Sequence, residues 1–476
     1  MSNLKKNIFT RLALIIMLLV LTNFTTIAIN SKSASNKQVS TSDIQYDLLI
    51  ITPKIFSKYL NPLVHHKNEI GIKTIMVNLE DIYNQMFLQG RDEPEKIKYF
   101  IKEAIETWHI KYVLLVGGIK IQSSPSSEKW WLPVRYSHIE DCRYEGLVEK
   151  KFISDLYYAD IYDKNGNFSS WDTNNNGIFG EWLDNKSADD IIDLQPDVYV
   201  GRLPCSNIFE VKTMVKKIIN YESKNCQDSW FKKMVVVAGD TYPDINDYCE
   251  GELYTKMALD MMPGFSPIKL WASDGSLKNW VDVVKNINKG CGFIYFSGHG
   301  DPLEWATHPY RDSKKYIFGL GLTNMLFLNN KDMLPICIVG GCHNSMFNIS
   351  FFNTCWLSYL HIPKCWSWAL TSKINGGSIA TIGPTGLSYG PTDISSGEGG
   401  SDWLDMHFFD EYGLKGKDIL GETWGNTIVS FLQNFSINWN EKATGDAAMN
   451  AKNVEQWVLI GDPSLKIGGY INNNKN

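Results

Sequence analysis

Two reactive side chains stand directly after hydrophobic runs in the second half of the chain. His299 follows "FIYFSG" (293–298), and Cys342 follows "PICIVGG" (335–341). Both runs are apolar and rich in strand-forming residues, as expected for strands buried on both faces of a parallel sheet. Such sheets bind ligands at the carboxyl ends of their strands. If the two strands are neighbours, they present an imidazole and a thiol at one edge.

An imidazole beside a thiol can generate a nucleophile. A histidine that takes the thiol proton yields a thiolate, which attacks a carbonyl carbon and forms an acyl-enzyme. Glycines flank both residues, at positions 298, 300, 340 and 341. They allow a substrate backbone to approach and amide N–H groups to face a developing oxyanion. The pattern therefore predicts a cysteine hydrolase with His299 as the base and Cys342 as the nucleophile.

Each residue on its own is more often structural, and other classes of protein remain as alternatives. A metal hydrolase is a weaker alternative, because the available residues form no HExxH or other compact ligand motif. These residues are His299, Asp301, His308 and His343. A serine hydrolase is weaker still, because no GxSxG motif is present. The presence of both reactive residues argues against the last alternative, a non-catalytic surface protein used for binding or adhesion.

The composition indicates a folded, exported protein. The 476 residues carry a formal charge of −6 and no long Lys/Arg run, which argues against nucleic acid as a partner. Lys5, Lys6 and Arg11 precede the apolar segment 12–21, as in a secretory leader. Cleavage is favoured over an uncleaved membrane anchor, because the apolar run is short for a spanning helix. We therefore expect a secreted or cell-surface protein.

The cysteine count is compatible with a reactive thiol. Nine cysteines in an exported chain permit disulfides but leave at least one thiol unpaired. No CxxC pair is present, so neither a zinc ribbon nor a thioredoxin-like motif is supported.

Strand-like runs alternate with helical stretches along the chain, which is the pattern of an α/β fold with mostly parallel sheets flanked by helices. A polar insert at 130–196 interrupts the first series, and a second series starts at 234. We therefore expect two α/β subdomains. The expected boundaries are 1–30 for a signal peptide or membrane anchor, 31–43 for a linker, 44–226 for the N-terminal subdomain, 227–468 for the catalytic subdomain and 469–476 for a tail.

The reactive segments also carry a family resemblance. "SGHGDPLEWAT" (297–307) and "CHNSMF" (342–347) resemble the histidine and cysteine motifs of gingipain-type cysteine peptidases, within the caspase-like clan. "GGSIATIGPT" (376–385) and "VLIGDPSL" (458–465) are similar to later strands of that family. The resemblance covers about residues 45–468 and implies a caspase-like fold.

The resemblance implies a role for each matching residue. His299 would be the general base and acid and Cys342 the nucleophile, with the backbone amides of Gly300 and Cys342 as the oxyanion hole. Trp305 lies in the histidine motif and Gly341 directly precedes the cysteine motif, and both are expected at the substrate-binding site. The substrates would be proteins or peptides, and catalysis would need no cofactor.

An acid that faces a basic P1 side chain is harder to place. The matching region offers Asp240, Asp244, Asp247, Glu250 and Glu252. Asp247 aligns best, although an acidic helix start that suits the helix dipole explains any one of them equally well. Tyr389 stands about where the family has a tryptophan wall of the P1 pocket, which weakens the expectation of arginine specificity.

A second group of oxygen-bearing residues has the spacing of a calcium loop. The candidate ligands are Asp172, Asn174, Asn176, the backbone carbonyl of Ile178, and Glu181. With Gly177 they match the first part of an EF-hand loop. The glutamate that usually ends such a loop is missing, because Leu183 stands there. A structural calcium ion and an ion-free turn are therefore the two alternatives.

Overall fold

The structure, a computed structural model, covers most of the chain. The described residues are 45–120, 128–144, 147–184, 186–223, 229–243, 245, 247–349, 362–391 and 399–470. The predicted leader and linker, and residues 471–476 of the predicted tail, lie outside them. The described residues form one compact unit. Among them, no helix combines the length and the apolar character that crossing a membrane requires.

A ten-stranded sheet forms the centre of the described residues. Its strands are β1 (Leu48–Thr52), β2 (Thr74–Asn78), β3 (Tyr112–Val116), β9 (Tyr199–Leu203), β10 (Lys233–Ala238), β11 (Ser266–Trp271), β12 (Phe293–Ser297), β16 (Ile336–Gly340), β17 (Ala380–Pro384) and β18 (Trp457–Ile460). They lie in the order β11-β10-β12-β16-β17-β18-β9-β3-β1-β2. Every neighbouring pair is parallel except β17 and β18, so the mostly parallel α/β fold is confirmed.

One strand joins the two halves of this sheet. β18 pairs antiparallel with β17 and parallel with β9, the latter through Ile460 and Arg202. The strands β1, β2, β3 and β9 lie on one side of β18, and the strands of the second half lie on the other. The sheet therefore continues across the subdomain boundary that the sequence predicts near 226.

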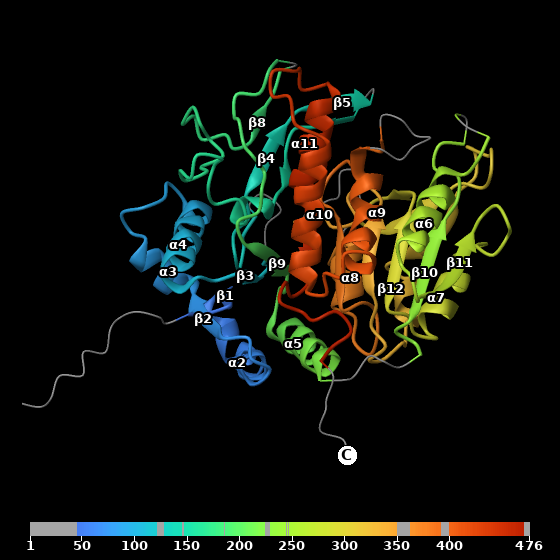
Figure 1. The fold of residues 1–476 in the computed structure, drawn as a ribbon, viewed down its shortest axis with the longest axis horizontal. Coiled ribbons are helices and arrows are strands. Elements are labelled where there is room, and N and C mark those ends of the chain that lie inside the picture. Colours follow the sequence, from blue (N-terminus) through green and yellow to red (C-terminus); the bar gives the residue numbers. More distant parts are fainter. Residues whose placement is uncertain are drawn as a thin grey trace, which may run out of the picture. The chain divides into compact units, whose positions relative to one another are not determined.

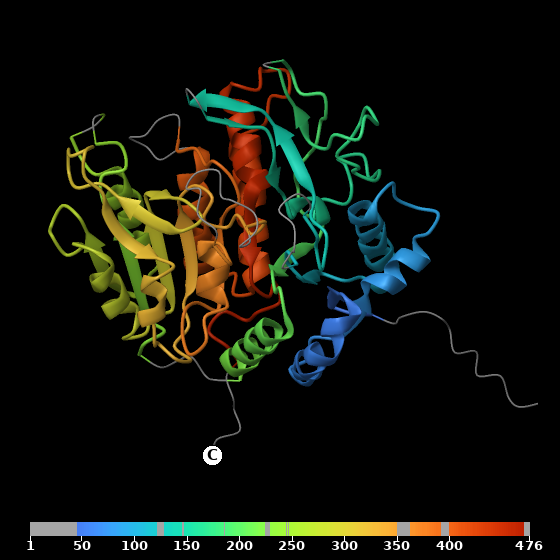
Figure 2. The same cartoon turned by 180° about the vertical axis from the view of Figure 1, so that it is seen from behind.

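Helices cover both faces of the sheet (Figure 1). They are α2 (Lys54–Glu69), α3 (Leu79–Gln85), α4 (Glu93–Trp108), α5 (Ile208–Glu222), α6 (Glu250–Asp260), α7 (Trp280–Ile287), α8 (Trp366–Thr371), α9 (Gly400–Gly413), α10 (Leu420–Asn434) and α11 (Asp446–Gln456). Successive side chains of a strand point to opposite faces. Phe293 and Tyr295 of β12 accordingly pack in one core with residues of α6 and α9, while Ile294 and Phe296 pack in another with α7 and α8. Figure 2 shows the molecule from the side opposite to Figure 1.

Capping residues in the sequence define where two of the helices between strands begin. Asp92 precedes α4 and its side chain accepts a hydrogen bond from the Glu95 N–H, with a proline in the first turn. Asn207 precedes α5 and accepts from two N–H groups of that helix. The sequence itself predicts helices at Pro94–Trp108 and Asn207–Ser223, close to these positions.

Short strands lie outside the main sheet. The polar insert contains β4 (Tyr136–Ile139), β5 (Asp141–Tyr144), β6 (Leu147–Glu149), β7 (Phe152–Ile153) and β8 (Glu181–Trp182). A separate antiparallel sheet follows β12 and consists of β13 (His299–Gly300), β14 (Glu304–Thr307) and β15 (Ile317–Gly321). We call β13 to β15 the histidine hairpin, because it begins at His299.

Candidate active site

β12 and β16 are neighbours, as the predicted chemistry requires. They pair in parallel over their whole length, ending at Ser297 and Gly340. Beyond that pair, the Gly298 N–H donates to the Gly340 carbonyl at 3.0 Å. His299 and Cys342 therefore follow adjacent strands at the same edge of the sheet.

The loops that carry these two residues touch through glycine backbones. A Cβ built on Gly341 would lie 3.0 Å from the Gly300 nitrogen and 2.5 Å from Oδ1 of Asn344. A Cβ built on Gly300 would overlap the same oxygen. Neither position can accept a side chain while the loops stay in place. The two glycines therefore allow these loops to approach each other closely.

Asn344 fixes the histidine hairpin to the loop that follows β16 and carries Cys342. We call this loop, residues 341–344, the nucleophile loop. Its side chain is buried, and Nδ2 donates to the carbonyls of Asp301 at 2.7 Å and of Glu304 at 3.1 Å. Asn344 lies two residues after Cys342, whereas both acceptors follow His299. This side chain therefore links the two candidate catalytic loops, a role that the sequence did not reveal.

Trp305 supports the hairpin from inside. The expectation that it binds substrate does not hold, because its side chain has no exposed surface. Its ring packs against Phe296 of β12, with the ring centroids 5.2 Å apart. Burial of the indole anchors the hairpin to the sheet.

The orientation of His299 is set by a backbone carbonyl. Nε2 of His299 lies 2.9 Å from the carbonyl oxygen of Thr241, which follows β10. A carbonyl only accepts hydrogen bonds, so we assign the proton to Nε2 and the free lone pair to Nδ1. The ring is thereby prepared to accept a proton at Nδ1. A backbone carbonyl has no signature in the sequence, which is why Thr241 was missed.

Both members of the candidate dyad are electrically neutral at rest. Burial lowers the pKa of His299, and the nearby His308 lowers it further. Burial also raises the pKa of the Cys342 thiol. Sγ of Cys342 lies 3.5 Å from the Ser388 nitrogen and 3.6 Å from the Ser388 carbonyl oxygen. At neutral pH the site therefore holds a thiol and an imidazole.

Exposure also distinguishes Cys342 among the cysteines whose thiols the structure describes. Cys342 is half-buried. The side chains of five others are buried: Cys205, Cys249, Cys291, Cys337 and Cys365.

A pocket of about 290 Å³ opens beside the imidazole of His299. It is lined by His299, Gly300, Asp301, Glu304, Ala306, Tyr316 and Phe318. The imidazole is thus accessible from the hairpin side.

The predicted specificity acid lies at the surface. Asp247 is exposed and forms an ion pair with Arg311. The Tyr310 hydroxyl donates to the Asp247 carbonyl at 3.2 Å. Of the other acids in that region, Asp244 lies outside the described residues. The structure thus gives Asp247 a partner other than His299.

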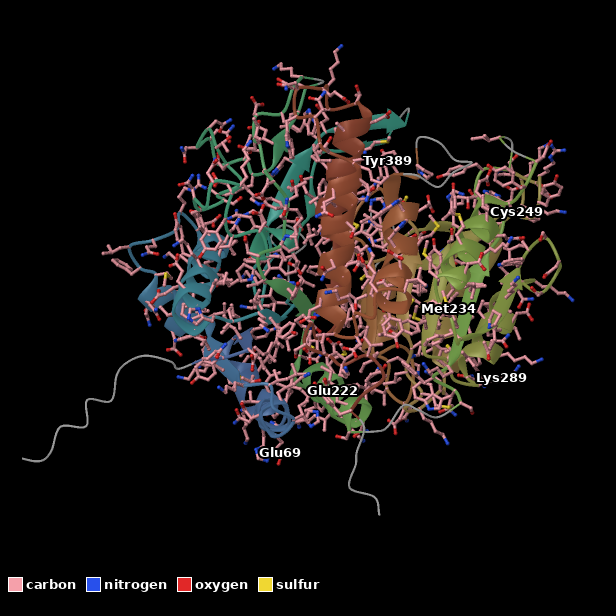
Figure 3. The ribbon with its side chains drawn as sticks, viewed as in Figure 1. Glu69, Glu222, Met234, Cys249, Lys289 and Tyr389 are labelled. Carbon is pink, nitrogen blue, oxygen red and sulfur yellow. The ribbon has the colours of Figure 1, made fainter. Side chains whose placement is uncertain are left out.

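A different acid is buried near Tyr389. In Figure 3, Tyr389 and Cys249 lie above Lys289, which precedes β12. Tyr389 is buried, and a Cβ built on the next residue, Gly390, would lie 3.0 Å from Oδ2 of Asp402. Burial raises the pKa of Asp402 to about 7, and the charge of Glu250 contributes. Among the described residues, no side chain donates a hydrogen bond to this carboxyl.

The predicted calcium loop is held by protein hydrogen bonds. The buried Asp172 accepts from the Asn176 and Gly177 N–H groups, both at 3.0 Å, and forms an ion pair with Arg91. Glu181 accepts from the Asn176 amide at 2.5 Å. The Arg91 guanidinium supplies positive charge at the place where a cation would, so the residues present do not favour an ion there. Calcium at this loop stays a prediction.

The residues considered for a metal hydrolase bind other protein groups. Nδ1 of His308 lies 2.6 Å from the Lys315 carbonyl oxygen, and Nε2 of His343 lies 2.8 Å from Glu149. In the part of the chain that the structure describes, no three His, Cys, Asp or Glu side chains converge as a metal site.

Comparison with known sequences identifies similar proteins. The profile of peptidase family C25 matches residues 41–468. Gingipain R2 of Porphyromonas gingivalis is 22% identical over 442 residues, which cover 88% of this chain and 46% of that protein. Gingipain R1 of the same organism is 23% identical over 442 residues, covering 88% of this chain and 34% of that protein. The chain thus spans less than half the length of these relatives.

Solved structures share the fold. The Arg-specific cysteine proteinase gingipain R superposes with a TM-score of 0.58 at 18% identity, covering 90% of this chain and 79% of that one. The complex of the pro- and mature domains of RgpB from Porphyromonas gingivalis also gives a TM-score of 0.58 at 18% identity, covering 88% of this chain and 79% of that one. The expected caspase-like fold is therefore confirmed.

Proposed function

The chain belongs to peptidase family C25, and on this premise we propose that it is an exported cysteine endopeptidase that forms an acyl-enzyme on Cys342. One observation carries the proposal. Two parallel neighbouring strands end in loops that meet at Gly300 and Gly341, and these loops hold a half-buried thiol and an imidazole of defined tautomer. Since one fold can serve many functions, this arrangement carries more weight than the fold itself.

The proposed reaction starts from the neutral dyad. Nδ1 of His299 takes the thiol proton as Sγ of Cys342 attacks the carbonyl carbon of the scissile bond. The N–H groups of Gly300 and Cys342 stabilise the oxyanion. The imidazolium then gives its proton to the leaving amine, and water hydrolyses the thioester with His299 as the base. The Thr241 carbonyl keeps Nε2 protonated and stabilises the imidazolium while it exists.

We further propose that the P1 side chain is basic, with Asp402 as its partner. A buried carboxyl beside Gly390 and Tyr389, with no side-chain donor among the described residues, suits a cationic group. Asp402 is a better candidate than the predicted Asp247, because Asp247 already pairs with Arg311 in solvent. Binding of a cation favours the ionised carboxylate and offsets the raised pKa of Asp402.

Substitution of the nucleophile tests the proposed reaction. Cys342→Ala should abolish labelling by a thiol-directed peptide probe and lower peptidase activity by at least ~1,000-fold, because the attacking atom is lost. Cys291→Ala is the matched control, since this buried thiol precedes β12 and lies at the opposite end of that strand. Labelling that persists in Cys342→Ala, or activity that a chelator abolishes instead, contradicts the mechanism. A folded wild-type protein without labelling or activity supports the non-catalytic surface binding alternative.

A peptide library tests the P1 preference. Wild-type enzyme should cleave after Lys or Arg, and Asp402→Asn should lower kcat/KM for these substrates by about 30-fold, equivalent to ~2 kcal/mol. Asp247→Asn is the control and should leave kcat/KM within about two-fold, because surface ion pairs contribute little. Equal cleavage after neutral P1 residues by the wild type contradicts the assignment.

Export is supported by the basic and apolar segments at 5–21. N-terminal sequencing of the secreted protein distinguishes a cleaved leader from a retained anchor. Calcium titration by calorimetry, with Asp172→Asn as the control, tests the predicted calcium loop.

A further inference from the structure

The buried carboxylate of Glu149 contacts the segments next to the candidate nucleophile. Oε1 of Glu149 is 2.8 Å from Nε2 of His343, and its Oε2 is 2.7 Å from Nζ of Lys452. The same Oε2 accepts the Leu387 N–H at 2.9 Å. The side chains of Glu149, His343 and Lys452 are all buried. One carboxylate thus binds two ionisable side chains and one backbone group.

The groups that Glu149 binds belong to the segments on either side of the thiol. His343 directly follows Cys342. Leu387 directly precedes Ser388, whose nitrogen and carbonyl oxygen are the atoms near Sγ. Any shift of Glu149 therefore acts on both segments at once.

The backbone at His343 depends on this support. Its φ is 58°, a left-handed conformation that residues other than glycine seldom adopt. The His343 N–H donates to the Gly386 carbonyl at 2.9 Å, and its side chain binds Glu149. Both contacts hold the residue in the conformation that presents Cys342.

We infer that Glu149 is a positioning residue for the nucleophile: it holds the loops on both sides of Cys342 through His343 and Leu387, with Lys452 balancing its charge. The inference rests on the proposed role of Cys342 as the nucleophile. Glu149 belongs to β6 in the polar insert of the first half, and Lys452 belongs to α11 near the end of the described residues. The polar insert, the segment after β16 and α11 thus meet next to the nucleophile, although they are distant in the sequence.

The two charges act on the thiol with opposite signs. Lys452 lowers the pKa of Cys342, and Glu149 raises it, while burial is the largest influence. Burial opposes ionisation of Glu149, but Lys452 and His343 together bring the pKa of this carboxyl down to about 2. Glu149 therefore stays charged throughout the neutral range, and among the described residues Glu149 and Lys452 are the charged side chains that act on the thiol.

Because Glu149 and Lys452 shift the thiol pKa in opposite directions, variants of these two residues can distinguish a positioning role from a general loss of stability. In Glu149→Gln the thiol pKa should fall, and in Lys452→Met it should rise, as measured by the pH dependence of iodoacetamide alkylation of Cys342. Both variants should lower kcat by about 100-fold with little change in KM, because a misplaced nucleophile affects the chemical step. A purely structural role would lower the melting temperature without shifting the thiol pKa in opposite directions.

A second variant tests the loop contact without removing the charge. His343→Asn keeps a residue that tolerates the left-handed backbone and leaves Glu149 bound to Lys452 and Leu387. It should lower kcat while the thiol pKa moves less than in Glu149→Gln. Glu140→Gln is the control from the same insert, since Glu140 meets Lys150 only at 3.8 Å in a partly exposed pair.

The possible failures can be told apart. Unchanged kcat in folded Glu149→Gln and His343→Asn overturns this inference while Cys342→Ala still loses labelling. Thiol pKa shifts of the same sign in Glu149→Gln and Lys452→Met also overturn it. Labelling that survives in Cys342→Ala overturns the proposed function instead.

Discussion

The protonation states of His299 and Cys342 decide how the dyad works. Burial lowers the imidazole pKa and raises the thiol pKa, so a thiolate–imidazolium pair is disfavoured at rest. Proton transfer should therefore accompany attack on the substrate, with His299 acting as a general base. Such a thiol should react slowly with small alkylating agents at neutral pH.

This state predicts the pH dependence of the reaction. The base must be neutral, so kcat/KM should rise with pH through the free-enzyme pKa of His299. That pKa lies below its usual value of about 6.5. In Asp402→Asn, which lacks the P1 acid whose pKa is about 7, kcat/KM should stay flat above the His299 pKa to about pH 8, because the raised thiol pKa keeps Cys342 protonated. Steady-state kinetics across this range test it. A rising limb centred above pH 7 in this variant, where thiolate formation would govern the rate, contradicts it.

Residues that belong to one continuous motif could be predicted from the sequence, and residues that the fold assembles could not. His299 and Cys342 each follow a recognisable apolar run with flanking glycines. Thr241 acts through its backbone, and Asp402 has no neighbouring motif. Glu149 lies far from His343 in the sequence, and nothing local connects them. The acids near Asp247 were visible only as a cluster, which could not show that Asp247 faces solvent.

Among the elements, contact between the histidine hairpin and the nucleophile loop leaves no room for a side chain at Gly300. Gly300→Ala should lower kcat by about 100-fold, because the hairpin must move away from Asn344. Gly321→Ala is the matched control in the same hairpin, since its Cβ would meet mainly the movable end of Asn324 at 3.1 Å. Parallel measurements of kcat and melting temperature decide the result. Equal losses in the two variants would show that the Gly300 contact has no special role.

The helices and strands differ in how well the sequence predicts them. α4 and α5 combine apolar periodicity with capping residues, and β12 is a short apolar run, so all three were expected. The sequence did not predict α11, because polar residues occupy buried positions that apolar side chains normally fill. Hydrogen bonds and ion pairs satisfy these polar residues inside the protein. These buried polar residues are Lys452, Asn453, Glu455 and Gln456. Periodicity of apolar residues cannot reveal a helix of this kind.

For the molecule as a whole, buried acids set the response of stability to pH. Burial raises the pKa of Asp160 and of Glu455 to about 8, and that of Asp402 to about 7. The folded state therefore holds protons that the unfolded chain releases above about pH 4.5. These acids make stability fall as pH rises from about 5 to 7, against a smaller opposite effect of His138, His299 and His407, whose pKa values burial lowers. Glu149, whose pKa is lowered to about 2, is ionised in both states over this window and does not affect the slope.

Thermal unfolding tests this balance. The melting temperature should be higher at pH 5 than at pH 7, and Glu455→Gln should reduce the difference, because an amide does not titrate. Glu69→Gln at the exposed end of α2 is the control and should leave the difference unchanged. A melting temperature that increases steadily from pH 5 to pH 7 contradicts the expectation.

The continuity of the sheet was the largest feature that the sequence did not show. The alternation of strands and helices predicts parallel strands, and β18 was expected as a strand. Neither its antiparallel pairing with β17 nor its place beside β9 follows from its own residues, because "WVLI" is compatible with any buried strand. Strand order depends on long-range packing, which local patterns do not encode.

The position of β18 also sets an order of events during synthesis. Every other strand of the main sheet precedes β18 in the sequence, yet β18 lies between β17 and β9. Until residues 457–460 leave the ribosome, both neighbouring strands expose unpaired edges, which are sites for aggregation. Lys452 also arrives only at this late stage. We therefore expect the main sheet to be completed, and the support beside Cys342 to form, only after residues 452–460 have been synthesised.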